Sequence, residues 1–353
     1  MGMANRYSKS RIRSIVVVFP SRIGNTIQAM PFLRATRKHY SESWITLLVK
    51  KPQADLLRHH GTYDDLIVFR RNTIWEIIRV SWILRRRRYD LLIDLGGLVK
   101  GGLVTVLSGA KRKLGYNYGD SMDGTWVATN QKIPPLMVRH RPKNNVDRYL
   151  AFARHLGVPV SDRVYGLEGQ PEDRDEAYRI LRAGGVDLDR PMVGLILDSA
   201  RRRKLWQGKL FMEVAKRLSE DGYQVLIISN HPERVLQNGS LPPSCFDFTQ
   251  KLNLRTLPPT FQKCSFVVGA DTGPLHLAGA SGTRAFALFG PTNYLRYMPM
   301  APGTVVIQRN RGLHCLRRSR RIPCLRHVCM ENIRPEDVLD AIHRHSPATA
   351  PLN

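Results

Sequence analysis

The sequence lacks any apolar run long enough to cross a membrane. No uninterrupted apolar stretch reaches the roughly 18 residues that a spanning helix requires, and charged residues at 24% exclude a membrane-embedded protein. The apolar run behind the basic N-terminal segment, Ile15 to Phe19, is too short for a secretory signal. The Ser or Thr of a myristoylation motif is also missing after Gly2. We therefore expect a cytoplasmic protein whose cysteines are reduced.

Cysteine is scarce, with five residues in the chain, and a tight C-x-x-C pair is missing. Cys315, Cys324 and Cys329 lie close together in the sequence, with His314 and His327 beside them. Three thiols and an imidazole can hold zinc or iron. The C-x8-C-x4-C spacing is looser than that of established metal knuckles, so we predict that the protein binds no metal.

Acidic residues are also few: 29 Asp and Glu stand against 55 Lys and Arg, which gives a net charge of +26. Such a surface attracts a polyanion, whether nucleic acid, an anionic membrane or a phosphorylated substrate. Basic residues cluster at Arg85–Arg88, Arg201–Lys204 and Arg317–Arg321. Aromatic residues do not interleave with these clusters, which argues against a protein that stacks single-stranded bases. A merely solvated basic surface fits the composition equally well.

Short apolar runs alternate with helix-length amphipathic segments, the pattern of a parallel sheet with crossover helices. We predict strands at 14–19, 44–49, 65–69, 91–94, 193–197, 224–229, 266–269 and 285–289, and helices at 26–39, 53–60, 73–86, 98–107, 146–156, 209–220, 254–263, 274–280 and 335–345.

The alternation restarts after a linker-like passage at 157–176. The fold class is therefore α/β, with two Rossmann-like domains, residues 1–165 and 166–353, whose parallel sheets face a central cleft. Ligands are expected at the carboxyl ends of the strands.

The strongest motif is FVVGADTGPLHLAGASGTRAFALFGPTN, residues 266–293. A strand ends before Asp271 and Thr272, either of which can cap the following helix, and Pro274 suits its first turn. The free N–H groups and dipole of such a helix start favour a diphosphate, and His276 is placed to face the same ligand. An ordinary capped helix with a solvated histidine would give a similar sequence. The second turn, LFGPTN, favours the ligand site because it ends on the same side of the sheet.

Three further strand ends carry polar residues. Ser199 and Lys204 follow one strand, and Lys204 could neutralise charge on a departing diphosphate; a solvated loop anchored by Trp206 is the alternative. Glu233 could hydrogen-bond a ribose or simply start a helix. Asp94 precedes a double glycine, and we favour a role in holding that turn.

Together these segments resemble the ADP-heptose:lipopolysaccharide heptosyltransferases, glycosyltransferase family nine, over nearly the whole chain. The most specific match is Asp-Thr-Gly-x-x-His-x-Ala followed by Phe-Gly-Pro-Thr. The others are RIGNTIQAMPFLRATRKHY, DLLIDLGGLVKGG, NNVDRYLAFARHLG and the Lys204-x-Trp206 pair. The resemblance implies a GT-B fold, acceptor binding by the N-terminal domain and nucleotide-sugar binding by the C-terminal domain. It also implies inversion at the sugar carbon and neither metal nor cofactor.

Residue roles carry over by position. The resemblance implies that Ser199 and Lys204 contact the donor diphosphate and that Glu233 reaches the ribose. Lys100, with Gly24 and Asn25, would lie on the acceptor side. The nucleotide–sugar pocket would be formed by Asp271, Thr272, Gly273 and His276.

Asn25 departs from the family, which usually has an Asp after Gly24 as the general base. A neutral amide can orient a hydroxyl but cannot accept its proton. The enzyme could rely on positioning and on Lys204, Asp94 could act as the base, or the protein could bind without turnover. We expect a transferase with reduced or rerouted base catalysis. The alternative is a non-catalytic or weakly active GT-B protein that binds polyanions or nucleotide sugars.

The resemblance also implies partners. The donor would be ADP-L-glycero-D-manno-heptose, and the acceptor an anionic, phosphorylated lipid oligosaccharide of the lipopolysaccharide inner core. Arg85–Arg88 and Arg317–Arg321 would face the inner leaflet of the cytoplasmic membrane. We expect a peripheral membrane protein that does not bind nucleic acid.

Overall fold

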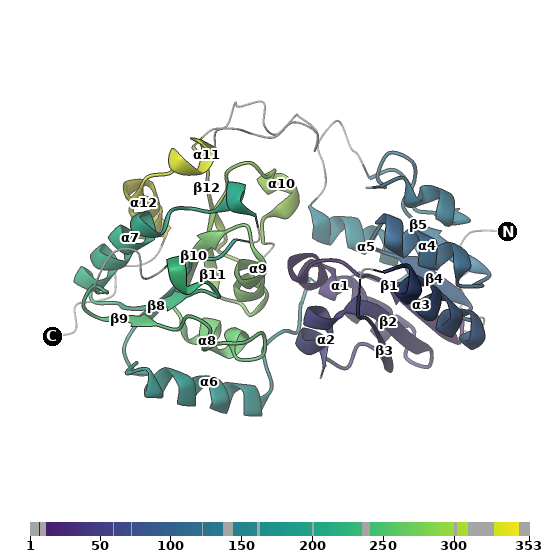
Figure 1. Ribbon diagram of the computed structural model, residues 1–353, viewed down its shortest axis with the longest axis horizontal. Coiled ribbons are helices and arrows are strands. Elements are labelled where there is room, and N and C mark those ends of the chain that lie inside the picture. The colour runs from purple at the N-terminus through teal and green to yellow at the C-terminus, as the bar shows by residue number, and fades with distance from the viewer. Residues whose placement is uncertain are drawn as a thin grey trace. The chain divides into compact units, whose positions relative to one another are not determined.

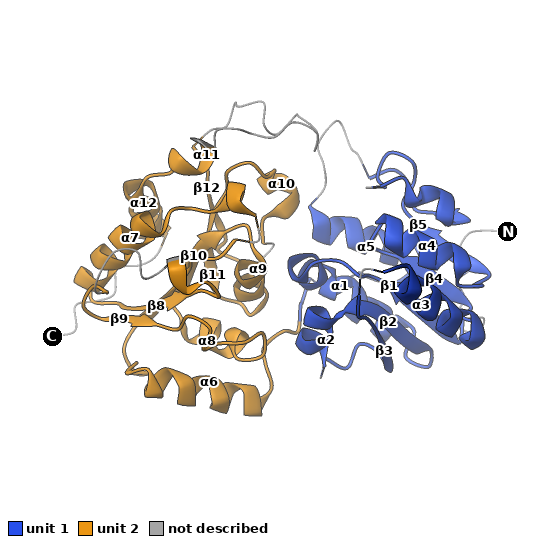
Figure 2. Ribbon diagram, in the orientation of Figure 1, with its two compact units in different colours: residues 1–165 blue, residues 166–353 orange. Residues whose placement is uncertain are grey.

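The chain forms two compact units, Met1–Tyr165 and Gly166–Asn353, which Figure 2 distinguishes by colour. The structure is a computed structural model, and it describes residues 7, 12–58, 60–71, 73–121, 123–136, 144–160, 163–199, 201–234, 241–299, 302–309 and 328–345. Within these ranges, no helix is both long enough and apolar enough to span a bilayer. Figure 1 labels the elements.

The first unit is built on a six-stranded parallel sheet with the strand order β3-β2-β1-β4-β5-β6. The strands are β1 (Ser14–Val18), β2 (Trp44–Lys50), β3 (Asp65–Phe69), β4 (Leu91–Asp94), β5 (Arg112–Gly115) and β6 (Gln131–Lys132).

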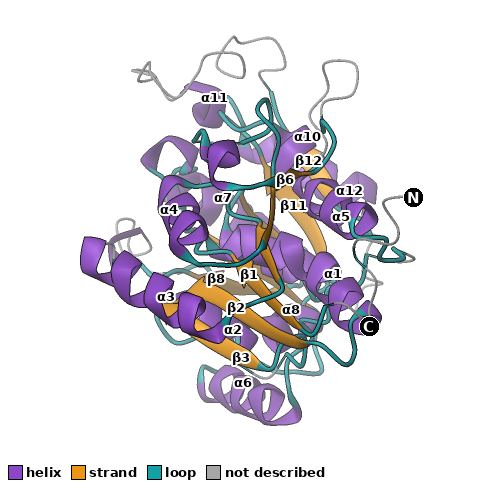
Figure 3. Cartoon of the chain, turned by 90° about the vertical axis from the view of Figure 1, so that its right-hand side faces the viewer, coloured by secondary structure: helices purple, strands orange, loops and turns teal. Residues whose placement is uncertain are grey.

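Helices cover both faces of this sheet, because its central strands are apolar on both sides. On one face α3 (Ile74–Arg87) and α4 (Val99–Leu107) pack side by side, and α3 buries Ile77, Val80 and Leu84 against the strands. On the other face α1 (Ile23–His39) packs against α5 (Asn145–His155). Figure 3 shows these two helix pairs on opposite sides of β1 and β2. The remaining helices are α2 (Lys51–Leu57) and the short η3 (Thr125–Ala128).

The second unit repeats this design with the strand order β12-β11-β10-β7-β8-β9, again parallel throughout. The strands are β7 (Met192–Ile196), β8 (Gln224–Ile228), β9 (Cys245–Asp247), β10 (Phe266–Ala270), β11 (Arg284–Leu288) and β12 (Val305–Ile307).

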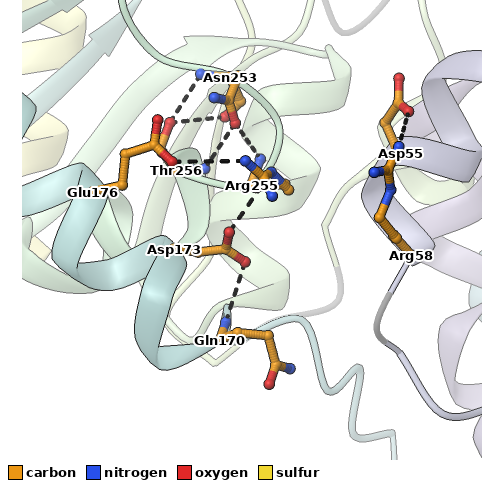
Figure 4. A network of polar contacts seen from close by, with 8 residues as sticks. All are labelled: Asp55, Arg58, Gln170, Asp173, Glu176, Asn253, Arg255 and Thr256. Carbon is orange, nitrogen blue, oxygen red and sulfur yellow. Dashed lines mark hydrogen bonds and ion pairs between the residues drawn. The ribbon is translucent and has the colours of Figure 1, made fainter.

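One face of this sheet is covered by α7 (Gly208–Glu220) and α12 (Pro335–His345), which bury apolar side chains with the strands in one cluster. Across the sheet α8 (Leu257–Lys263) packs against α9 (Gly273–Ala280). Next to α8 lies α6 (Pro171–Ala183), whose acids pair with a loop arginine, as Figure 4 shows. Shorter helical segments are η4 (Arg202–Lys204), η5 (Pro232–Arg234), α10 (Tyr294–Tyr297) and α11 (Val328–Glu331).

The strands and helices predicted from periodicity are all present, with shifted ends. Helix α1 begins at Ile23, three residues earlier than predicted. Four strands were missed: β5, β6, β9 and β12, each of two to four residues. They are too short to show an alternation of apolar and polar residues, and β6, β9 and β12 lie at sheet edges.

Each sheet reverses its strand order at one point. In the first unit the chain runs outward through β2 and β3 and then returns to place β4 on the other side of β1. In the second unit the corresponding neighbours are β7 and β10. The loops that follow two such strands lead away from each other, which leaves room for a ligand at their carboxyl ends.

A buried ion pair fixes the segment between β5 and α5. Arg148 Nη1 lies 3.4 Å from Asp120 Oδ1, with the two side chains 6% and 3% exposed. Arg148 also donates to the backbone oxygen of Asp120 and stacks over the Tyr116 ring. The other carboxylate oxygen of Asp120 accepts the Leu136 amide at 2.7 Å. The pair therefore ties α5 to the loop after β5.

We predict that Asp120→Ala lowers the free energy of unfolding by about 3–5 kcal/mol, because it leaves the Arg148 charge buried and unpaired. Asp55→Ala is the control: it removes an exposed i,i+3 partner of Arg58 and should cost less than about 1 kcal/mol. Urea denaturation of both variants measures the difference. Equal stability of the two variants would contradict the role assigned to the buried pair.

Candidate active site

Lys204 and Asp271 meet at the point where the second sheet reverses its strand order. Lys204 comes from the loop after β7, and Asp271 follows the last residue of β10. Lys204 Nζ donates to Asp271 Oδ2 at 2.5 Å, and the side chains are 15% and 6% exposed. His276 Nε2, from the first turns of α9, lies 3.3 Å from Asp271 Oδ1. One carboxylate therefore orients a cation from one loop and an imidazole from another.

The electrostatics keep this carboxylate charged. Burial alone would raise the pKa of Asp271, but the His276 hydrogen bond and the positive charge of Lys204 outweigh it and lower the pKa to about 2. The charged form of Asp271 is thus maintained across the physiological range, and with it the position of the Lys204 ammonium.

The start of α9 holds polar atoms that lack a partner. Thr272 occupies the N-cap position, yet its side chain does not cap the helix, contrary to the sequence prediction that Asp271 or Thr272 would. Thr272 Oγ1, His276 Nδ1 and Thr292 Oγ1 are buried without a hydrogen-bond partner among the described residues. Thr292 lies in the loop after β11, the strand beside β10. Because such atoms cost free energy when left unsatisfied, they indicate a ligand or water at this edge.

The loop that carries Lys204 is held by its neighbours. Trp206 is buried, packs edge-to-face on Phe211 and donates its indole N–H to Ile333 O at 2.9 Å. Trp206 is therefore a packing anchor, as the alternative interpretation held. The loop that it anchors is not merely solvated, because Lys204, two residues earlier, is paired with Asp271.

Asp198, in the same loop, was missed from the sequence. It accepts hydrogen bonds from Ser229 Oγ at 2.7 Å and from the Asn230 amide at 2.6 Å, which joins the loop after β7 to the loop after β8. An acid at or just after the end of a predicted strand was the available signal, shared with Asp94 and Asp271.

Three other predicted donor residues follow strands of the second sheet at the same edge. Ser199 is buried, and its hydroxyl bonds to the backbone of Arg201, two residues on. Glu233 is exposed and lies 3.0 Å from His231 Nδ1. Gly273 is the first residue of α9.

In the first unit, Asn25 lies in the first turn of α1, after Gly24, at the carboxyl end of β1. Its amide nitrogen donates to Ser21 Oγ at 2.7 Å. The side chain is half-buried, so the amide is fixed by the preceding turn. An amide held in this way presents its oxygen as a hydrogen-bond acceptor.

Gln53 of α2, another residue missed from the sequence, fixes the same turn. It is buried and donates to Phe19 O at 3.1 Å and to Thr26 Oγ1. Its own oxygen accepts the Lys50 amide at 2.7 Å. Gln53, the third residue of α2, thus satisfies the backbone N–H of Lys50 just before the helix, while the Lys50 ammonium has no acceptor with which to return the bond.

Asp94 lies at the end of β4, beside Val18 of β1. It is 1% exposed, and its Oδ1 accepts the amides of Gly96 and Gly97, both at 3.1 Å. Gly97 has a φ of +57°, which only glycine adopts easily. Burial raises the pKa of Asp94 to about 6, although these amides partly lower it. The geometry supports the turn-holding role, while the pKa is that of a carboxyl group able to accept a proton near neutrality.

Basic residues gather around this edge. Lys100 lies in the first turn of α4, Arg22 precedes α1 and Lys50 ends β2. Burial lowers the pKa of the Lys50 ammonium, and the nearby charges of Lys100 and Arg22 lower it further. The three cations come from the ends of adjacent strands or the helices after them, which favours an anionic ligand.

The Cys- and His-containing loop, for which the sequence predicts no metal, is mostly outside the described residues, as are Cys315, Cys324 and Arg317–Arg321. Cys329 is buried in α11. Among the residues that the structure describes, no group of three or more His, Cys, Asp or Glu side chains is placed to hold a metal ion.

Two Rossmann-like units, each with a parallel sheet and polar side chains at its switch point, are the architecture of the GT-B fold. The sequence profile of glycosyltransferase family 9 (heptosyltransferase) matches residues 77–326. The chain belongs to this family.

Individual relatives are distant but cover most of the chain. The lipopolysaccharide core heptosyltransferase OpsX of Haemophilus influenzae is 24% identical over 293 residues, 81% of this chain and 82% of the relative. The solved structure of a family 9 glycosyl transferase from Veillonella parvula superposes with a TM-score of 0.76 and 22% identity, covering 94% of this chain and 96% of that one. The ADP-heptose lps heptosyltransferase II of E. coli gives a TM-score of 0.73, 20% identity, and coverage of 94% and 98%. These structures confirm the predicted fold class.

We predict that Asp271 stabilises the protein in a pH-dependent way. Its pKa in the fold, about 2, is below the ordinary 3.8, so its contribution is complete above pH 3.8 and is lost as the pH falls toward 2. At neutral pH, Asp271→Asn should lower the free energy of unfolding by roughly 2 kcal/mol.

Urea denaturation at several pH values measures this effect. The difference between the unsubstituted protein and Asp271→Asn should be constant at higher pH and should shrink as the pH falls from 3.8 toward about 2. Asp175→Asn, at an exposed position of α6, is the matched control and should show no such trend. A difference that is independent of pH would contradict the ionic role of Asp271.

Proposed function

We propose that this protein transfers heptose from ADP-L-glycero-D-manno-heptose to an acceptor of the lipopolysaccharide inner core. The observation that carries the proposal is the Lys204–Asp271–His276 group at the switch point of the second sheet, beside buried polar atoms without partners. Two relatives support the donor and the acceptor: one is a lipopolysaccharide core heptosyltransferase and the other an ADP-heptose lps heptosyltransferase.

The second unit would bind the donor. As the bond between the anomeric carbon and the diphosphate oxygen breaks, negative charge accumulates on the leaving ADP. The Lys204 ammonium, held by Asp271, and the first-turn N–H groups of α9 would stabilise this charge. His276 Nδ1 and the hydroxyls of Thr272 and Thr292, which lack partners in the described structure, would then bind the nucleotide sugar.

The first unit would bind the acceptor. The cations Arg22, Lys50 and Lys100 would attract its phosphate or carboxylate groups. Asn25, fixed by Ser21, would accept a hydrogen bond from the attacking hydroxyl and orient it toward the anomeric carbon. The new carbon–oxygen bond forms on the face opposite the departing ADP, which inverts the configuration. Because Asn25 cannot accept the hydroxyl proton, the proton passes to solvent or to a basic side chain.

We propose further that this reaction needs no metal ion, because Lys204 and the α9 helix start supply positive charge where a divalent cation would otherwise act. The proposed place of action is the cytoplasmic face of the inner membrane, where a phosphorylated lipid acceptor would be met. The basic net charge of +26 supports this location.

The proposal is tested by incubating the protein with ADP-heptose and truncated core acceptors and following ADP release. We predict that Lys204→Ala lowers kcat/KM at least 100-fold, because charge on the leaving ADP loses its counter-ion. Arg202→Ala, an exposed cation of the same 3₁₀ turn, is the matched control and should retain activity within about threefold. Equal activity of the two variants would exclude Lys204 from the reaction.

A second prediction concerns Asn25. Asn25→Asp supplies a carboxylate at the hydroxyl-binding position, and we predict a rise in kcat of at least tenfold, toward the 10²–10⁴ that general bases contribute. The affinity for ADP-heptose should not change, since Asn25 is assigned to the acceptor side.

Asn25→Ala is the companion variant and should lower kcat, because it removes the orienting amide. If neither the natural protein nor Asn25→Asp releases ADP with any core acceptor, the alternative holds, and the chain is a binding protein on a glycosyltransferase scaffold. ADP-heptose affinity that is lost in Lys204→Ala would still define the donor site in that case.

A further inference from the structure

Helix α3 exposes large apolar side chains along its outer face. Ile74, Trp75, Ile78 and Trp82 are all exposed, and the two indoles are 76% and 57% accessible. Trp75, Ile78 and Trp82 are separated by three, four or seven residues, and Ile74 lies four residues before Ile78, so they share one side of the helix. The opposite side of α3 is also apolar, because it forms the core of the first unit. A surface helix ordinarily presents a polar outer face, so this face is built to be covered.

The neighbouring helix extends the same surface. Val99, Leu103, Val106 and Leu107 of α4 are exposed, and α4 packs beside α3 on the same side of the sheet. Eight of the thirteen large apolar side chains exposed in the described residues belong to these two helices. We call these eight side chains the α3–α4 face. Exposed apolar surface of this extent marks an interaction site.

The charged residues of α3 and α4 are nearly all basic, and Arg87 is paired with Asp65 of β3. Helix α3 ends in Arg85–Arg87, and Arg88 follows as its C-cap. Glu76 is the one carboxylate in the sequences of α3 and α4; it is buried and pairs with Arg79. The guanidinium of Arg86 lies 4.5 Å from the centre of the Trp82 ring. The turn of the helix thus brings Trp82 beside the arginine run. The sequence analysis found no aromatic residue within this run and overlooked this contact.

We propose that the α3–α4 face docks on an anionic lipid bilayer, with its tryptophans and aliphatic side chains at the head-group boundary and its arginines on lipid phosphates. Proteins that bind at the membrane–water interface typically combine tryptophan, aliphatic side chains and basic residues on one face. This inference rests on the proposed function, because a protein whose acceptor is anchored in a lipid bilayer has to work at the membrane surface.

A second copy of the chain fits this surface less well. In a symmetric dimer the same patch meets itself, so the arginines at the end of α3 would meet a partner face that also lacks exposed acids. An anionic bilayer instead supplies the missing negative charge, at a gain of about fivefold in affinity for each arginine near the surface.

The position of the face agrees with the acceptor site. In a parallel sheet the helix after each strand begins at the carboxyl edge, so Ile74, Trp75 and Val99 lie at that edge, with Lys100 next in the chain. The α3–α4 face therefore begins beside the cations Arg22, Lys50 and Lys100 of the same unit. A protein docked by this face would keep the acceptor-binding edge of the first unit close to the head groups.

The test is co-sedimentation of the full chain with vesicles of phosphatidylcholine, with and without phosphatidylglycerol. The natural protein should bind the phosphatidylglycerol vesicles, and binding should weaken as salt is raised. The double variant Trp75→Ser, Trp82→Ser should bind the phosphatidylglycerol vesicles at least about tenfold more weakly. Trp44→Ser, another exposed tryptophan of the same unit but outside α3 and α4, is the matched control and should bind unchanged.

A second variant tests the charge without harming the fold. Arg88 has a φ of +51° as the C-cap of α3, a conformation that glycine adopts without strain. Arg88→Gly should therefore fold at least as well, and it should weaken vesicle binding about fivefold.

Three results would overturn the proposal: no binding to phosphatidylglycerol vesicles, equal binding by the double tryptophan variant, or a dimer that the double variant converts to monomer while vesicle binding is unchanged. ADP release with a lipid-free truncated acceptor tests heptose transfer without a membrane, and so separates membrane docking from the proposed function. The double variant should keep that activity, whereas vesicle binding by a protein that never releases ADP would show that the proposed function alone has failed.

Discussion

The donor site depends on one carboxylate, Asp271, which lies between Lys204 and His276. Its Oδ2 holds the Lys204 ammonium in place. Its Oδ1 contacts Nε2 of His276, which leaves Nδ1 for a ligand. Burial by itself would favour the neutral acid, and the two basic partners reverse that preference, so that the pKa falls to about 2. The group therefore stays preorganised at any pH at which the protein is expected to work, and the ammonium does not have to be repositioned when a diphosphate arrives.

The same topological constraint produces both candidate sites. Parallel strands place all their carboxyl ends at one edge, and a reversal of strand order leaves an opening between two of them. In the second unit this brings Lys204 and Asp271 together from loops 67 residues apart. In the first unit it sets Asn25 at the end of β1 and Asp94 at the end of β4. The two sites differ in chemistry: one is a cation held by an acid, and the other a neutral amide surrounded by Arg22, Lys50 and Lys100.

Much of this could be predicted from the sequence, because apolar periodicity reports burial directly. The central strands, the helices after them and the motif at 266–293 all follow from local pattern. The short strands β5, β6, β9 and β12 could not be predicted, since their pairing is decided by neighbours distant in the sequence. Asp198 could have been singled out by its place at a strand end, but its partners, like those of Gln53, lie in other loops and are met only in the folded chain. The outer face of α3 was missed for another reason: the helix has apolar residues on more than one side, and which of them stay exposed is decided by what packs against it.

The central claim is that the diphosphate of the donor binds at the β7–β10 edge of the second unit. A crystal structure of the protein with ADP tests it most directly. The account predicts that the diphosphate lies within hydrogen-bond distance of Lys204 Nζ and of the first-turn amides of α9, with the Asp271–His276 contact retained. Diphosphate oxygens bound at any other edge of either sheet, with Lys204 and α9 left uncontacted, would contradict it.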